Sequence, residues 1–162
     1  MKTVIYYFSH DGNTQWLAER ISAGEMADLC RLIPYKEYPR SKINYLVGGM
    51  GVVFGLEPQI AGLKFRPTEY DTVIIATPVW ASSFVPPIKS FLAQYDLRDK
   101  DVILVATSSG GDATKCFKAL RKRLTGSRIV GEYSFVSPIQ ADSADVSEQV
   151  STIRQLIGSK AE

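Results

Sequence analysis

Three short polar segments of the chain each follow directly on an apolar run. They are Ser9–Thr14, Thr77–Phe84 and Thr107–Asp112, and they combine hydroxyl side chains with glycine, an amide or one large aromatic residue. Segments of this composition leave hydroxyls and backbone N–H groups available to a ligand. We therefore expect the chemistry of the protein to lie in these segments, provided that the fold brings them together.

The first segment reads Ser-His-Asp-Gly-Asn-Thr and lies between a predicted strand and a predicted helix. A chain that turns in this way directs the first N–H groups of the helix toward an anion. The hydroxyls of Ser9 and Thr14 and the amide of Asn13 add hydrogen-bonding groups, whereas the segment has no lysine. This combination predicts a metal-free site for a single phosphate monoester.

Asp11 is the unusual residue of this segment, because a carboxylate repels a phosphate. At a separation of about 4 Å the repulsion is around 1 kcal/mol or more per charge pair, depending on the local dielectric constant. A carboxylate at the start of a helix can instead accept a backbone N–H as a cap. We expect Asp11 to cap the helix and face water, and a carboxylate that faces the phosphate is the alternative.

The second and third segments add features that suit a flat ring. Trp80 follows a predicted strand, and Gly110 and Gly111 would let the backbone approach the polar edge of a ring. A phosphate site with an indole and backbone donors nearby describes a flat heteroaromatic nucleotide. The candidate binding residues are Ser9, His10, Asp11, Gly12, Asn13, Thr14, Thr77, Pro78, Val79, Trp80, Ala81, Ser108, Ser109, Gly110, Gly111 and Asp112.

Three of the nearby rings allow two interpretations each. Trp80 stands at a strand end between Pro78 and a pair of serines, which favours ligand contact over burial in the core. His10 could donate to the phosphate or could be an exposed loop residue. Trp16 follows the polar segment, and we expect it to pack against the protein and not to bind the ligand.

Motifs for several other site classes are incomplete. Gly49-Met50-Gly51 begins like a dinucleotide fingerprint, but Phe54 occupies the third glycine position. His10 is the single histidine, so the sequence predicts neither a metal cluster nor a Ser-His-Asp triad, and we name no catalytic residue. Cys30 and Cys116 form no CxxC pair, and we expect both to be buried and inert.

The elements that would position these segments follow from the apolar pattern. Several runs are continuous and not alternating, which is typical of parallel strands that are covered on both faces. The predicted strands are Thr3–Phe8, Asp28–Ile33, Thr72–Ala76, Val102–Thr107 and Ile129–Val136. Helical patterns lie between them at Thr14–Ala23 and Val85–Tyr95, after Asp112 and after Ser143. Alternating strands and helices predict a doubly wound five-stranded parallel α/β sheet with helices on both faces.

Size and composition limit the classes of protein to which the chain can belong. The 162 residues fit one domain, residues 1–162, and the contents of 45% hydrophobic and 22% charged residues are ordinary. No apolar run approaches the roughly 20 residues that span a bilayer, and no secretion signal is recognised, so we expect a cytoplasmic protein. A net charge of +2 gives no indication of nucleic-acid binding.

The sequence allows two interpretations of each of two segments. Pro34–Pro67 is long for a loop, and we expect a short helix around Asn44–Phe54. The glycine-rich stretch Tyr45–Gly55 could pack on the sheet or form a subunit interface. The basic residues between Lys115 and Arg123 indicate a solvated helix face, with a partner surface as the alternative.

With these motifs the chain resembles the flavodoxin-like flavoproteins of the short-chain type. Ser9-x-x-Gly12-Asn13-Thr14 is similar to the loop that binds the phosphate of FMN. Thr77-Pro78-Val79-Trp80, followed by Pro86-Pro87-x-x-x-Phe91-Leu92, is similar to the isoalloxazine loop and the helix after it. The resemblance spans most of the chain and implies the strand order 2-1-3-4-5 and bound FMN.

The chain departs from that family in three respects. Asp11 stands where Thr or Ser is usual, and the third segment lacks the tyrosine that covers the second ring face in many members. That face is open to a substrate, or Phe84, the glycine-rich stretch or another subunit covers it. The chain is also mildly basic, whereas the electron-shuttling members are strongly acidic.

The resemblance implies an FMN-binding flavoprotein that acts in electron transfer or as an FMN-dependent oxidoreductase. One alternative is a NAD(P)H-dependent quinone or flavin reductase. An alternative of another class is a non-catalytic interaction protein with a degenerate FMN site. We expect a redox partner such as NAD(P)H or a quinone, no nucleic acid, no membrane span, and a monomer or homodimer.

Overall fold

Parallel strands form the centre of the molecule, and their order confirms the predicted doubly wound α/β sheet. The computed structural model describes residues 1–24, 26–38 and 49–159. The order is β2-β1-β3-β5-β6, with the short β4 paired to β3 off this path, so the parallel strands follow the order 2-1-3-4-5. These strands are β1 (Thr3–Tyr7), β2 (Asp28–Arg31), β3 (Thr72–Trp80), β5 (Asp101–Ser108) and β6 (Arg128–Val136).

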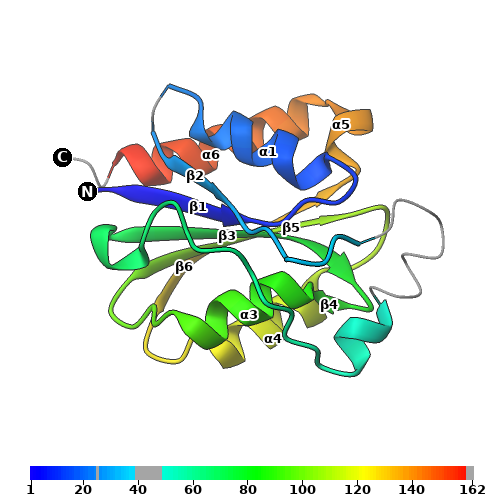
Figure 1. The fold of residues 1–162 in the computed structure, drawn as a ribbon. Helices are drawn as coiled ribbons and strands as arrows, with labels where there is room; N and C mark the ends of the chain where they lie inside the picture. The colour runs from blue at the N-terminus through cyan, green and yellow to red at the C-terminus, as the bar shows by residue number, and fades with distance from the viewer. Residues whose placement is uncertain (25, 39–48, 160–162) are drawn as a thin grey trace.

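Helices cover both faces of this sheet (Figure 1). The continuous apolar runs of β1, β3 and β5 are buried because each face packs against a helical layer. One apolar core lies between the sheet and α1 and α6, and the other lies between the sheet and α3 and α4. The long helices are α1 (Asn13–Ser22), α3 (Pro86–Gln94), α4 (Thr114–Arg123) and α6 (Ala144–Gly158); the short ones are η1 (Pro67–Glu69) and α5 (Pro138–Ala141).

Local chemistry explains where these helices begin. Pro86 opens α3, where a missing N–H costs no hydrogen bond. Ser143 caps α6 as predicted, since its side chain accepts a hydrogen bond from the Val146 N–H. Asp112 was expected to occupy the same position in α4 but does not, because Ala113 is the N-cap residue there. The Asp112 carboxylate lies one residue earlier and accepts the Thr114 N–H at 2.9 Å.

The second polar segment is a β-hairpin and not the open loop that its composition indicates. β3 continues to Trp80, and β4 (Ser83–Phe84) returns antiparallel to it. The connecting residues Ala81 and Ser82 have φ values of 46° and 61°. Two-residue hairpin loops need left-handed conformations, which usually select Gly or Asn. The sequence shows neither residue at these positions, so the hairpin could not be read from it.

The segment predicted to be a long loop is described in part. Residues 49–53 are helical, in agreement with part of the helix expected around Asn44–Phe54, and the remainder of that helix lies outside the described residues. The chain then returns to the sheet edge, where Pro34 and Ile60 form an isolated antiparallel bridge. The segment therefore runs past α3 before it rejoins the fold.

The structure also tests the expectations about other site classes. Cys30 and Cys116 are both buried and unpaired, as predicted, and burial raises the pKa of the Cys116 thiol to about 12. Within residues 1–24, 26–38 and 49–159, no cluster of His, Cys, Asp and Glu could hold a metal ion. Each helix in this part of the chain is too short or too polar to cross a membrane.

Candidate functional site

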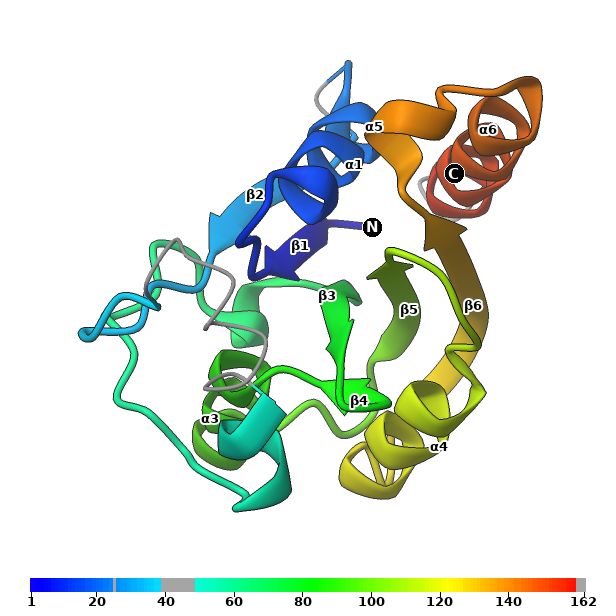
Figure 2. The same ribbon diagram turned by 90° about the vertical axis from the view of Figure 1, so that its right-hand side faces the viewer.

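The three polar segments meet at one edge of the sheet. β1, β3 and β5 end on the right-hand side of Figure 1, which faces the viewer in Figure 2. A shallow cleft of about 30 Å³ lies there, so a ligand the size of a nucleotide must lie across the strand ends or move the loops apart. All three segments contribute to its lining, which consists of Asp11, Asn13, Pro78, Val79, Trp80, Thr107, Ser108 and Ser109.

The first segment turns through Gly12, the N-cap residue of α1, at a φ of 93°. This left-handed conformation suits glycine because it has no Cβ. The Asn13 N–H, the first of the helix, donates to Oδ1 of Asp11 at 3.0 Å, and the Asn13 amide donates to Oδ2 at 3.0 Å. The exposed Asp11 carboxylate thus binds a donor at the helix start, which supports the predicted capping role.

Ser9 is the best indication of a ligand at this turn. Its side chain is 4% exposed, and its Oγ has no hydrogen-bond partner among the described residues. A buried hydroxyl that lacks a partner costs about 1–3 kcal/mol, so proteins normally satisfy it. Ser108, at the end of β5, also has a buried Oγ without a hydrogen-bond partner among the described residues. Both hydroxyls lie at the carboxyl ends of strands, where ligands bind in this class of fold.

Thr14 and Thr77 are predicted binding residues that the structure places in supporting positions. The Thr14 Oγ1 lies 2.7 Å from the Thr107 Oγ1 in a fully buried contact that joins the first segment to the third. The Thr77 Oγ1 donates to the Pro78 carbonyl at 2.8 Å and accepts the Val85 N–H at 3.3 Å. The Thr14 hydroxyl joins the first and third segments, and the Thr77 hydroxyl holds the backbone of the second, so their contribution to a ligand would be indirect.

Trp80 both lines the cleft and packs in an aromatic cluster. It is 7% exposed, and its ring lies edge-on to Phe8, His10 and Tyr38 at centroid distances of 5.8, 5.9 and 5.3 Å. Ligand contact and burial in the core are therefore compatible for Trp80, because one part of the indole can face a ligand while the rest is buried. Phe8 and Tyr38 support it, and no sequence motif marks either residue.

The third segment is open around its glycines. A Cβ at Gly110 or Gly111 would have no described atom within 4 Å, and their φ values are 155° and 126°. Asp112 is turned away toward α4, where hydrogen bonds from Thr114 hold the pKa of its carboxyl below the usual range. The backbone near Gly110 is thus free to approach a ring, whereas the Asp112 carboxylate is held at the start of α4 by the Thr114 N–H.

The C-terminal part of the chain also reaches the site, which the sequence does not indicate. The backbone N–H of Ile139, in α5, donates to the Asn13 Oδ1 at 3.2 Å. Asn13 therefore connects Asp11 with α5 and fixes the outer side of the first segment. Trp16, one turn into α1, is half-buried and lies under the Arg20 guanidinium at 3.9 Å, in agreement with a packing role.

Two larger hollows lie near or beyond the cleft. One, of about 340 Å³, adjoins the first segment through Ser9 and His10 and extends along the end of β2 past Arg31. The other, of about 820 Å³, is an open groove between α1 and α6. The second is far from the strand ends that carry the polar segments, so its size alone does not make it the functional site.

Comparisons with known proteins agree with this geometry. A family model described as Flavodoxin matches residues 2–132. A search of curated proteins found no match. Among solved structures, a flavoprotein in complex with FMN from Lactobacillus acidophilus is 22% identical with a TM-score of 0.70, covering 87% of this chain and 96% of that chain. A candidate flavoprotein from Bacteroides eggerthii is 22% identical with a TM-score of 0.79, covering 97% and 98%.

A third solved structure extends the comparison. Oxidised flavodoxin 2 from Bacillus cereus is 17% identical with a TM-score of 0.64, and the alignment covers 99% of both chains. At these identities the structural similarity establishes the fold. It leaves the role of each residue at the cleft to be argued from the contacts of this chain.

Proposed function

The chain belongs to the flavodoxin family, and from this premise we propose that it is an FMN-binding flavoprotein that transfers electrons at the cleft. The observation that carries the proposal is the buried Ser9 hydroxyl without a partner among the described residues, at the start of a glycine turn into α1. A ligand phosphate there would satisfy this hydroxyl and N–H groups of the first helical turn after that of Asn13, which donates to Asp11. The flavodoxin family and the FMN complex of the Lactobacillus acidophilus protein support FMN as that ligand.

The first segment would hold the phosphate without a metal, and the Arg31 guanidinium, which donates to the Ser9 carbonyl at 3.3 Å, lies beside it. Ser9 donates its hydroxyl, and the backbone N–H groups beyond Gly12 contribute the positive end of the helix dipole. The Asp11 carboxylate accepts the Asn13 N–H and is exposed, so solvent screens its repulsion of the phosphate. A single short turn of this kind fits a terminal monophosphate better than a bridging diphosphate.

The second and third segments would hold the ring. Trp80 offers an aromatic surface that its packing against Phe8 and Tyr38 keeps in place. Ser108, with its unpartnered Oγ, and the open backbone at Gly110 offer polar contacts to the ring edge. Bound FMN supplies the capacity to accept and release electrons, while the protein positions the ring and controls which molecules approach it.

We place electron transfer first and a NAD(P)H-dependent quinone or flavin reductase second. One observation favours the second: no aromatic side chain lies in the third segment, and the space beside Gly110 and Gly111 is open among the described residues. An open ring face would admit a flat acceptor such as a quinone. Among the described residues that line the cleft, Asp11 is the one ionisable side chain, so no side chain there is assigned to acid–base catalysis.

Reconstitution and turnover assays test the proposal. The protein mixed with FMN and freed of excess flavin should be yellow, with bands near roughly 370 and 450 nm that belong to the cofactor. A colourless protein would contradict the proposal and favour the non-catalytic alternative. NADH or NADPH oxidation that requires both bound FMN and a quinone would assign the reductase. Absence of turnover with a flavin that still accepts electrons from dithionite would assign the carrier.

A further inference from the structure

Helix α4 carries an unusually uniform charge. Every ionisable side chain in the helix other than Cys116 is basic, and all of the basic ones are exposed, whereas the whole chain has a net charge of only +2. Arg121 pairs with Glu132, and the Asp112 carboxylate lies near Lys115. No described residue forms an ion pair with the others. We call Lys115, Lys118, Lys122 and Arg123 the basic face.

The segment from Met50 to Leu56, between β2 and η1 in the chain, exposes large apolar side chains. The exposed fractions are 48% for Met50, 73% for Val53, 70% for Phe54 and 56% for Leu56. Single exposed apolar residues are common, but a group of them within one short segment indicates a contact surface. We call these four residues the apolar patch.

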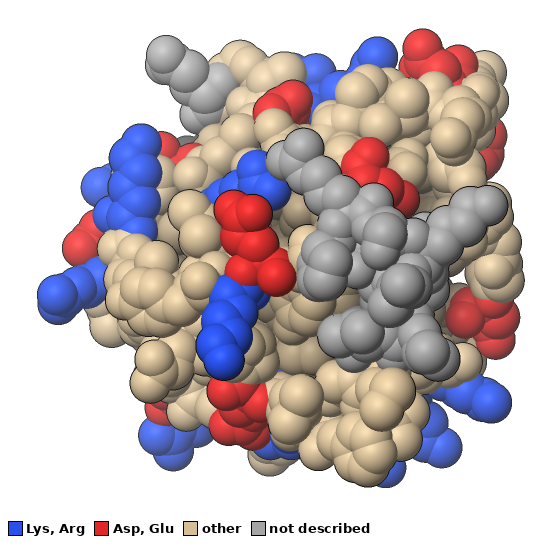
Figure 3. Space-filling view, turned by 45° about the vertical axis from the view of Figure 1, so that its right-hand side comes forward, with Lys and Arg blue, Asp and Glu red and all other residues tan. Residues whose placement is uncertain are grey.

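Leu56 of the apolar patch and Lys122 and Arg123 of the basic face line the same groove, and the other members of both groups lie outside its lining. One wall of this groove, which holds about 290 Å³, includes Gly51 and Leu56, and the opposite wall includes Ala119, Lys122 and Arg123. Figure 2 shows α4 and the helical turn that carries Met50 on either side of β4. In Figure 3, Lys and Arg side chains project along the lower right margin, the side toward which α4 lies in Figure 2.

The groove is separated from the cofactor cleft by a single hairpin. Ser83 and Phe84 line the groove, and they pair with Trp80 and Val79, which line the cleft. A molecule seated in the groove would thus lie one hairpin away from a ring held against Trp80. Electron transfer needs this kind of proximity but no covalent contact.

We propose that the apolar patch and the basic face together dock the acidic surface of a protein redox partner; the inference rests on the proposed function. The cations are spread along about 10 Å of helix, since Lys115 and Lys122 are seven residues apart at about 1.5 Å each. An extended row of exposed charges beside apolar residues matches the polar rim and apolar centre of a protein interface. A small polyphosphate would need several free cations that converge on it. Lys122 and Arg123 line the groove, but its third cation, Lys89, pairs with Glu57 and donates to the Gly55 carbonyl.

The redox step at this surface balances with a one-electron acceptor. Fully reduced FMN releases two electrons and two protons in total, and each ferric haem of an acceptor protein takes one electron. Two acceptor molecules are therefore reduced for each flavin, and the two protons pass to water. No bond forms between the partners.

The test compares two forms of one acceptor that differ in charge. Native cytochrome c is basic, and cytochrome c with succinylated lysines is acidic, while the haem is the same in both. With the FMN-loaded, dithionite-reduced protein at low ionic strength, we expect the acidic form to be reduced at least about tenfold faster, because charge complementarity raises the association rate. The difference should shrink as salt screens the charges.

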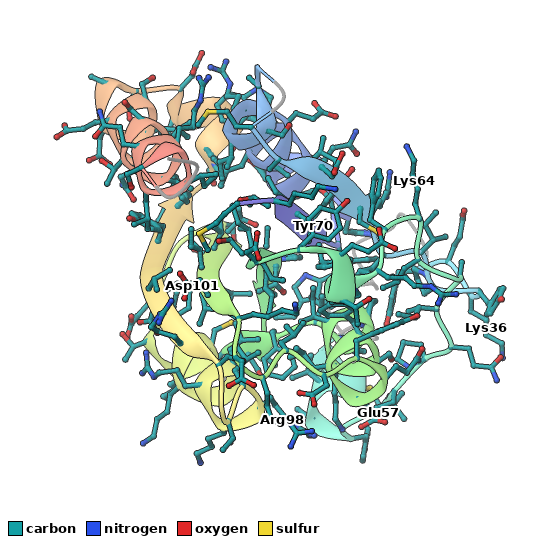
Figure 4. The ribbon with its side chains drawn as sticks, turned by 90° about the vertical axis from the view of Figure 1, so that its left-hand side faces the viewer. Lys36, Glu57, Lys64, Tyr70, Arg98 and Asp101 are labelled. Carbon is teal, nitrogen blue, oxygen red and sulfur yellow. The ribbon has the colours of Figure 1, made fainter. Side chains whose placement is uncertain are left out.

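Charge-matched variants locate the surface. Lys118→Glu with Lys122→Glu should abolish the preference for the acidic form. Lys36→Glu with Lys64→Glu changes the net charge equally and should preserve it; both lysines are exposed, and they lie on the side of the molecule away from α4 (Figure 4). Phe54→Ser should slow the acidic cytochrome several-fold. Tyr35→Ser, at an aromatic residue that is also 70% exposed, should leave the rate unchanged.

Three results would overturn the proposal. The first is equal rates for both cytochromes at low salt, and the second is equal effects of the two lysine pairs. The third is a loss of ferricyanide reduction in the α4 variant as large as the loss for the acidic cytochrome, with no such loss for the cation hexaammineruthenium(III), which would indicate a site for small anions. Flavin absorbance of the wild type and of each variant is recorded first. A wild type without FMN would contradict the proposed function, whereas a variant that retains FMN but loses the preference for the acidic cytochrome has lost docking.

Discussion

At the scale of residues, Asp11 and Ser9 show how a phosphate loop can contain an acid. Asp11 accepts the Asn13 N–H and its amide at 3.0 Å each and faces solvent, whereas the buried Ser9 Oγ has no partner among the described residues. The two side chains therefore serve different purposes. Asp11 stabilises the start of α1, and Ser9 is left for the ligand.

We predict that Asp11→Thr changes FMN affinity by less than about threefold and stability by only a few tenths of a kcal/mol, because Thr also caps helices. FMN titration and urea unfolding of both proteins, at low and high salt, measure these quantities. Tighter binding of about tenfold in the variant, shrinking as salt increases, would show that the carboxylate faces the phosphate.

Trp80 combines a structural and a binding role, so its removal should affect both. We predict that Trp80→Ala lowers the free energy of unfolding by about 3–5 kcal/mol, the usual cost of removing a buried large aromatic residue. It should also weaken FMN about tenfold or more, since stacking on an aromatic side chain contributes about 1–3 kcal/mol for bases.

Two companion variants separate these roles. Trp80→Phe retains a ring and should fold well while still weakening FMN measurably. Trp16→Phe, on α1 outside the cleft lining, should leave the FMN affinity unchanged. If Trp80→Ala binds FMN as tightly as the wild type under native conditions, Trp80 belongs to the core alone.

At the scale of elements, the β3–β4 hairpin is a strained connection beside the site. Ala81 adopts a φ of 46°, a left-handed conformation that costs a non-glycine residue about 1–2 kcal/mol. Its side chain is exposed, so the methyl group contributes little packing in return. Strain of this kind is common where a backbone is shaped for a ligand.

We predict that Ala81→Gly raises the free energy of unfolding by about 0.5–1 kcal/mol, the relief of strain less the added freedom of the unfolded chain. Ala119→Gly is the control, because Ala119 lies within α4 and the same change should destabilise by about 1 kcal/mol. Equal destabilisation of both variants in urea would show that Ala81 carries no strain.

The elements also show how far the sequence can be read. The strands with continuous apolar runs and the helices with regular apolar spacing were predicted to within a few residues, whereas the strand order was predicted from the resemblance to the flavodoxin-like flavoproteins. The hairpin was missed because Ala81 and Ser82 carry no turn signal, and the apolar residues before them continue the strand. Asp112 was placed one position too late, at the N-cap. It lies just before the N-cap residue, and from there its carboxylate accepts the first helical N–H.

The same limit applies to the site. Loops at strand ends were predicted because topology brings the carboxyl ends of parallel strands together. The partners of individual side chains were not, since the contact between Thr14 and Thr107 and the packing of Tyr38 on Trp80 join positions far apart in the sequence. Such contacts depend on how the layers pack, and one sequence carries no pattern for them.

At the scale of the whole molecule, the helical layers on the two faces of the sheet have different roles. The layer of α1 and α6 shapes the phosphate end through Gly12 and the contact of Ile139 with Asn13. The layer of α3 and α4 supports the hairpin, the groove, the apolar patch and the basic face. The cofactor cleft lies where both layers meet the strand ends, so one ligand can contact elements from the whole chain (Figure 2).

A titration of FMN against riboflavin tests the central claim most directly, because the two flavins differ only in the phosphate. We predict that the wild type binds FMN at least about 100-fold more tightly, equal to about 2.7 kcal/mol. Ser9→Ala should reduce this ratio about tenfold or more, while Ser151→Ala, at an exposed position of α6, should leave it unchanged. Equal affinity of the wild type for FMN and riboflavin would contradict the assignment of the phosphate to Ser9–Thr14.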